Sequence, residues 1–184
     1  MWHRKTGEEQ ADRYATAEDF CRLFAQGVDE LYQLSFLLTA DHQKAEKCFV
    51  AGLDDSVSSN RVFKESARSW AKRTIIENAI RQLKPHLSFA GPPALPVPLE
   101  MGELTDTRDS DRKLNNVLAL PTFERFVFVV SVLEHYSEHD SGILLGCSPR
   151  EIRKARVWAL AQLGTCSRIV SMEADFEGIR ELTR

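Results

Sequence analysis

The sequence has no long hydrophobic run. None of its stretches approaches the roughly 18 consecutive apolar residues that a membrane-spanning helix needs. The first residues, MWHRKTGEEQADRY, carry charges but lack the apolar core of a secretory signal or a membrane anchor. We therefore expect a cytoplasmic protein with no membrane-embedded segment.

Metal-binding, redox and catalytic motifs are also missing. No Gly-rich phosphate loop, GxSxG or HExxH motif occurs. His135 and His139 have metal-ligand spacing but no third ligand, so a surface pair is the simpler interpretation. We expect no enzyme activity, no cofactor and no metal site. The cysteines form no CxxC pair, and we expect reduced, mostly buried thiols at Cys21, Cys48, Cys147 and Cys166.

Positive charge is not in excess. The chain has 24 Lys and Arg residues against 27 Asp and Glu, a formal charge of −3. A protein that coats nucleic acid through its overall charge needs many cations facing phosphates. Any nucleic-acid contact must therefore be local.

Helical periodicity is the main signal that the sequence does contain. Apolar residues three and four apart predict one long helix from Asp19 to about Thr39 and a second helix capped by Asp41. A third helix is expected from about Val62 to Leu83. It turns a basic face outward, which includes Arg68, Lys72, Arg73 and Arg81.

Proline separates two modules. Five of the seven prolines lie between residues 84 and 110, where they disfavour helix and central strand. We interpret residues 84–113 as an extended linker between helical modules at 19–83 and 114–163. The predicted fold is all-α, with two small helical bundles and a C-terminal helix-turn-helix.

The C-terminal module has the signals of that motif. After a short helix from residue 114, residues 122–136 are apolar almost all round and predict a buried helix, although their β-branched content also permits a strand. Ser137 can cap a helix that ends at Gly146. Ser148 can cap the next helix, because a proline and a glutamate follow at its first and third positions.

Two helices joined by a short turn with glycine are typical of the helix-turn-helix, whose second helix enters the major groove. Between Ser148 and Leu163 four cations and one acid give a local charge of +3. Ile152, Ala155, Ala159 and Leu163 can face inward. The alternative is a packing corner with a solvated basic face. The four cations, which we expect to face DNA, are Arg150, Arg153, Lys154 and Arg156.

Residues 120–163 begin with Leu-Pro, continue with Glu124-Arg125 and an apolar helix, and close with the glycine turn and a helix ending in Ala and Leu. In this order they resemble the promoter-reading C-terminal domain of bacterial RNA polymerase sigma factors of the extracytoplasmic-function type. The resemblance implies a transcription initiation protein that binds promoter DNA.

The N-terminal module resembles the other half of that family. Residues 37–53 are similar to the helix that docks on core RNA polymerase, which implies contacts from Ala45, Glu46, Phe49 and Leu53. Residues 69–83 are similar to the helix that contacts melted promoter DNA. Together with the basic face, this similarity assigns Arg68, Trp70, Lys72, Arg73, Asn78 and Arg81 to DNA.

The sequence departs from the family at several positions. Lys47 and Val50 stand where the family has Asp and Gln, and Trp158 and Leu160 stand where it has further arginines. These changes favour an alternative from another class, a sigma-like regulator that acts through protein contacts without promoter binding. An anti-sigma factor or a second copy of the chain is a candidate partner.

The last part of the chain extends beyond the resemblance. Apolar residues at near-helical spacing predict an amphipathic helix within 164–184, and a flexible tail is the alternative. The residues with that spacing are Ile169, Met172, Phe176, Ile179 and Leu182.

Overall fold

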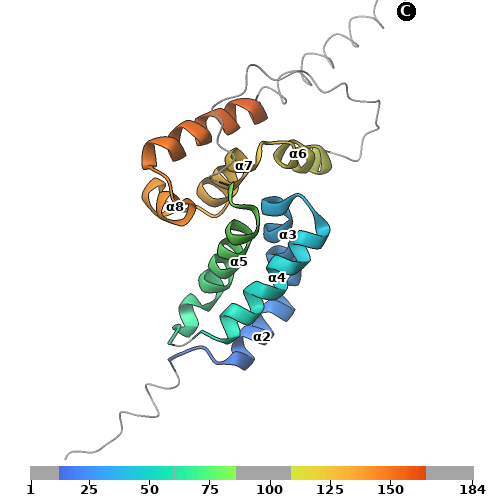
Figure 1. The fold of residues 1–184 in the computed structure, drawn as a ribbon. Coiled ribbons are helices and arrows are strands. Elements are labelled where there is room, and N and C mark those ends of the chain that lie inside the picture. The colour runs from blue at the N-terminus through green and yellow to red at the C-terminus, as the bar shows by residue number, and fades with distance from the viewer. Residues whose placement is uncertain (1–12, 60, 86–108, 165–184) are drawn as a thin grey trace, which may run out of the picture. The chain divides into compact units, whose positions relative to one another are not determined.

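The computed structural model describes residues 13–59, 61–85 and 109–164 (Figure 1). Within these ranges every regular element is a helix, which confirms the predicted all-α fold. Tyr14 and Phe63 form an isolated antiparallel bridge. The chain divides into two compact units between Lys84 and Pro85. None of the described helices is both long and apolar enough to span a membrane.

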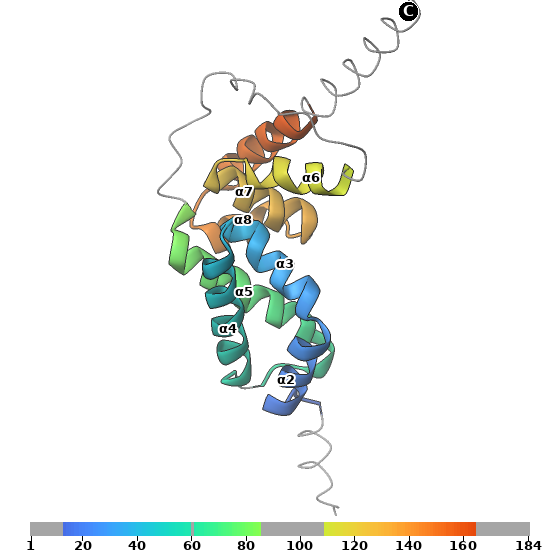
Figure 2. The same ribbon diagram turned by 90° about the vertical axis from the view of Figure 1, so that its right-hand side faces the viewer.

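The first unit contains four α-helices. They are α2 (Ala17–Gln26), α3 (Val28–Thr39), α4 (His42–Val57) and α5 (Ala67–Leu83). Helix α4 packs against the other three (Figure 2). The Asp41 side chain caps α4 by accepting a hydrogen bond from the Lys44 N–H at 2.9 Å, as its position in the sequence predicts.

The prediction of one long helix from Asp19 to Thr39 is wrong, because the helix is interrupted at Gly27. This residue lies at φ −104° and ψ 20°, and its N–H donates to the Leu23 carbonyl at 2.9 Å. Glycine is a poor helix former. The apolar stripe nevertheless continues across the break, since Phe20 and Leu31 are both buried, and this continuity hides the break from a periodicity analysis.

Helix α5 begins at Ala67, later than the expected Val62. The preceding residues are instead tied to the segment before α2. The Ala15 N–H donates to the Val62 carbonyl at 2.7 Å, and the Lys64 N–H donates to the Arg13 carbonyl at 2.9 Å. A short 3-10 turn, Lys64–Ser66, then leads into α5.

Close helix contact in the first unit depends on Gly52. A Cβ atom at this position would lie 2.6 Å from Cγ1 of Ile75, so α4 and α5 approach through a glycine. The Ser56 and Thr74 hydroxyls are 3.0 Å apart and form a buried hydrogen bond beside this contact. The buried core of the first unit includes Phe20, Phe24, Leu31, Leu34, Leu38, Ala45, Cys48, Ile75, Ile76 and Ala79.

The described part of the second unit comprises α6 (Asp109–Leu118), α7 (Thr122–Phe128), a π-helical segment (Val129–Leu133), α8 (Glu138–Leu145) and a helix over residues 149–164. Helix α6 therefore starts inside the segment expected to be linker. The helical interpretation of residues 122–136 is confirmed over the strand, and its centre is buried. The widened π turn, in which the Glu134 N–H donates to the Val129 carbonyl, ends this helix earlier than predicted.

Arg125, the second residue of the Glu-Arg pair, contacts the end of helix α6. Its side chain is buried, and Nη1 donates to the carbonyl oxygens of Leu118 and Leu120 at 3.1 Å each. These carbonyls lie where α6 ends, and helix ends leave carbonyls without intrahelical partners. Arg125 thus joins the end of α6 to α7.

Two predictions fall largely outside the described residues. The linker over 84–113 lies outside them except for residues 84, 85 and 109–113, and the C-terminal amphipathic helix lies outside them beyond Gly164.

Candidate nucleic-acid interface

The turn between α8 and helix 149–164 has the predicted caps. The Ser137 hydroxyl accepts from the Asp140 N–H at 3.0 Å, and Gly146 ends α8 in the left-handed conformation at φ 68°. Ser148 and Glu151 form the reciprocal capping box, with the Ser148 N–H donating to the Glu151 carboxylate at 2.8 Å. These local bonds fix where one helix ends and the next begins.

Gly142 allows the turn to fold back closely on α8. A Cβ at this position would lie 2.8 Å from the Cys147 carbonyl oxygen. The Cys147 N–H donates to the Gly142 carbonyl at 3.0 Å. This contact was not predicted, although a glycine inside a short helix can have a packing reason.

Helix 149–164 has a well-defined inner face. Ile152, Ala155 and Ala159 are buried as predicted, whereas Leu163, also expected to face inward, is half-buried. Their burial leaves the opposite face exposed, with cations in its first half at Arg150, Arg153 and Lys154. Its second half is apolar, since Val157 is 61% and Leu160 45% exposed. The outer face therefore combines a basic and an apolar half.

Glu138, the first residue of α8, binds two of the four cations. Its carboxylate lies 2.7 Å from Arg153 Nη2 and 2.8 Å from Arg156 Nη2, and Arg153 Nε also donates to it. We call these three residues the Glu138 clamp. The two arginines lower the pKa of Glu138, and the carboxylate in turn raises the pKa of Arg153. Glu138 has no role that was predicted from the sequence.

Cys147 lies in the turn itself. Burial, followed by the nearby Glu151 carboxylate, raises the pKa of its thiol to about 11. The thiol therefore stays protonated at neutral pH and is a poor nucleophile. Of the cysteines that the structure describes, Cys48 is buried as expected, Cys147 is half-buried and Cys21 is exposed.

The basic face of α5 is paired with acids of its own unit. Arg68 binds Glu30 of α3, and Lys72 Nζ lies 2.8 Å from the same carboxylate. Arg73 Nε lies 2.8 Å from Glu77 one turn along α5. The predicted DNA-contacting cations of this helix are thus in contact with carboxylates.

The remaining predicted DNA-contacting residues of α5 also have partners. Asn78 Nδ2 donates to the Asp55 carboxylate at 2.8 Å, and Arg81 binds the same oxygen. The Trp70 ring is half-buried, and its Nε1–H donates to the Ser59 hydroxyl at 2.8 Å. Asp55 therefore brings Asn78 and Arg81 together, whereas Trp70 is tied to the loop after α4.

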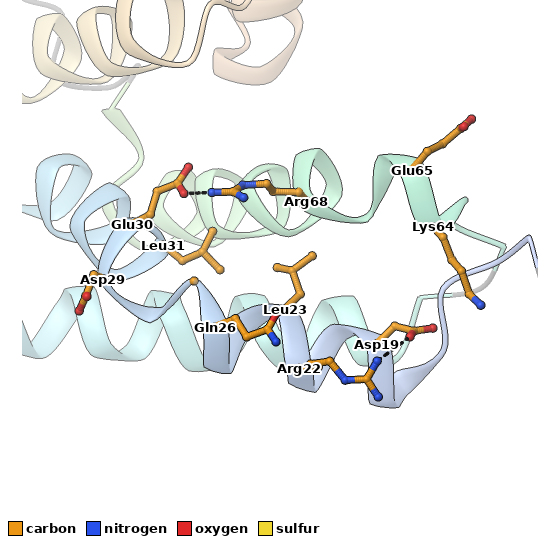
Figure 3. A pocket seen from close by; sticks show the side chains of 11 residues that line it. Asp19, Arg22, Leu23, Gln26, Asp29, Glu30, Leu31, Lys64, Glu65 and Arg68 are labelled. Carbon is orange, nitrogen blue, oxygen red and sulfur yellow. Dashed lines mark hydrogen bonds and ion pairs between the residues drawn. The ribbon is translucent and has the colours of Figure 1, made fainter.

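A pocket of about 490 Å³, lined by acidic and basic side chains, lies beside the ion pair between Glu30 and Arg68 (Figure 3). It is formed where α2 meets α3 and where the 3-10 turn leads into α5. Arg68 reaches Glu30 across it, and Asp19 lies near Arg22 on α2.

The four α4 residues that we expected to contact polymerase differ in their exposure to solvent. Ala45 is fully buried in the core, so its side chain does not reach the surface. Glu46 is exposed, while Phe49 is half-buried and packs edge-on against Phe24 at a centroid distance of 5.3 Å. Leu53 is half-buried. Val50, one of the departures from the family pattern, is 48% exposed on this helix.

No protein-family model matches the chain, and a search of curated proteins finds no match.

Proposed function

We propose that the protein is a sigma-factor-like transcription initiation protein that acts in the cytoplasm, where it binds core RNA polymerase and promoter DNA. The observation that carries this proposal is the arrangement of α8, the Gly146 turn and helix 149–164. Buried Ile152 and Ala155 hold the second helix on its unit and leave Arg150, Arg153 and Lys154 outward. A helix-turn-helix presents its second helix to the major groove in this way.

The proposed polymerase contact is tested by a pull-down with core RNA polymerase. The α4 surface carries Lys47 and Val50, and an acid with an amide would suit the hydrogen-bonding clamp that the resemblance implies. Lys47→Asp with Val50→Gln is expected to raise the yield. The control is Lys113→Asp, the same charge change in the second unit. An unchanged yield for the double variant would show that these positions do not face polymerase.

A second candidate function is regulation through protein contacts without promoter binding. Specific observations favour it: carboxylates pair with most of the proposed DNA-contacting cations, and Val157 and Leu160 are exposed on the outer face of helix 149–164. Exposed apolar residues on one face suit a protein partner, either an anti-sigma factor or a second copy. The two functions differ in duplex binding at low salt, which only the first requires.

A further inference from the structure

The Glu138 clamp gathers three charged groups at one point of the proposed DNA-binding face. Glu138 stands at the first position of α8, and its side chain is 22% exposed. Arg153 and Arg156 reach it from one side of the neighbouring helix. The structure thus holds two guanidinium groups around a single anion on the surface of the second unit.

A DNA phosphate has the chemistry to take that anion's place. Guanidinium groups bind carboxylates and phosphates through the same forked hydrogen bonds. The N-terminus of a helix also favours a negative group, and Glu138 lies at the N-terminus of α8. In helix-turn-helix complexes the first helix crosses the DNA backbone, which brings this end of α8 near phosphates.

The first unit repeats the arrangement. Asp55 binds Asn78 and Arg81, and Glu30 binds both Arg68 and Lys72. Each time, one carboxylate contacts two side chains that the sequence analysis predicts to contact DNA. Carboxylates therefore pair with predicted DNA-contacting side chains in both units of the protein.

We propose that the Glu138 carboxylate occupies a phosphate-binding site formed by Arg153 and Arg156, and that duplex DNA must displace it to bind. This inference rests on the proposed duplex binding and adds its regulation. Arg153 is 66% exposed and Glu138 is 22% exposed, so water reaches the pair and can solvate the released carboxylate, and ion pairs at the surface are weak. The clamp therefore weakens duplex binding without abolishing it.

The test is a titration of the full chain with a fluorescent duplex DNA at several salt concentrations. Glu138→Gln frees both arginines and is expected to bind roughly three- to tenfold tighter, with a log–log salt slope steeper by about one phosphate contact. Glu65→Gln makes the same charge change at an exposed position of the first unit and is expected to leave affinity within about twofold.

A second variant tests whether the gain depends on Arg156, while Glu65→Gln controls for the change in net charge. If Glu138 acts through its arginines, Glu138→Gln combined with Arg156→Gln must lose most of the gain. Equal affinity of wild type and Glu138→Gln would overturn the inference while leaving the proposed duplex binding intact. A gain that survives Arg156→Gln would also overturn it. No binding by any variant at low salt would overturn both the inference and the proposed function.

Discussion

Gly142 lies so close to Cys147 that a Cβ atom on the glycine would be 2.8 Å from the cysteine's carbonyl oxygen. The obstacle is backbone, which cannot move aside as a flexible side chain can. The position of the turn on α8 therefore depends on the absence of a side chain at residue 142.

Gly142→Ala is expected to destabilise the second unit by about 1–3 kcal/mol, the usual cost of overpacking. Gly→Ala inside a helix ordinarily stabilises a protein by roughly 0.5–1 kcal/mol, so the expected change in stability here has the opposite sign. Gly164→Ala is the control, because nothing lies within 4 Å of a Cβ there. Urea unfolding followed by circular dichroism measures both variants. Equal stability of Gly142→Ala and wild type would mean that the turn shifts freely.

Arg125 is expected to stabilise the second unit through the carbonyls of Leu118 and Leu120. Arg125→Met keeps the apolar stem but leaves both oxygens without this donor, and an orphaned buried polar group costs about 1–3 kcal/mol. Arg125→Lys is expected to recover part of the loss, since its ammonium can still donate hydrogen bonds but ends one atom short of the Nη1 position. Thermal unfolding should rank the three proteins in the order Arg, Lys, Met. A different order would show that packing of the stem dominates.

Glu124 is expected to give the second unit a distinctive pH dependence. Burial raises the pKa of this carboxyl above its ordinary value of 4.5. The folded state therefore holds the proton more tightly than the unfolded state, and stability falls as the pH rises from 4.5 through the folded pKa. Glu124→Gln mimics the protonated form and should raise the Tm at neutral pH but not in acid. A Tm difference that is the same at both pH values would contradict this assignment.

The features of the site that can be predicted from the sequence are those formed by residues close together in the chain. Ser148 and Glu151 are three residues apart and form the expected capping box, and Gly146 takes the expected left-handed conformation. Ile152 and Ala155 are buried as helical spacing predicts. Such features follow from hydrogen bonds and periodicity within one or two turns.

The ion pairs were not predictable in the same way. Glu138 meets Arg153 across the turn, and Asp55 meets Arg81 from a different helix. Periodicity shows which face of a helix is polar, but it does not show how one helix is rotated and shifted against its neighbour. The same limit applies to Gly27, where an uninterrupted apolar stripe conceals a break between two helices.

The last prediction separates a groove-reading helix from a packing corner. Arg153 lies on the outer face with its side chain 66% exposed, and exposed ion pairs contribute at most about 1 kcal/mol. Arg153→Glu should therefore weaken duplex binding with little loss of thermal stability. Ile152 is fully buried, so Ile152→Asp should unfold the second unit, because a buried unpaired charge is very costly.

Salt dependence gives this prediction a quantitative limit. Arg150, Arg153, Lys154 and Arg156 are the four cations of the helix, and each neutralised phosphate contributes roughly −0.9 to the slope of log affinity against log salt. The wild-type slope should be no steeper than about −4 by the same rule. Anisotropy titrations of wild type and Arg153→Glu measure both quantities. If the two proteins bind equally, or neither binds at low salt, helix 149–164 is a packing corner, and regulation through protein contacts replaces promoter recognition as the proposed function.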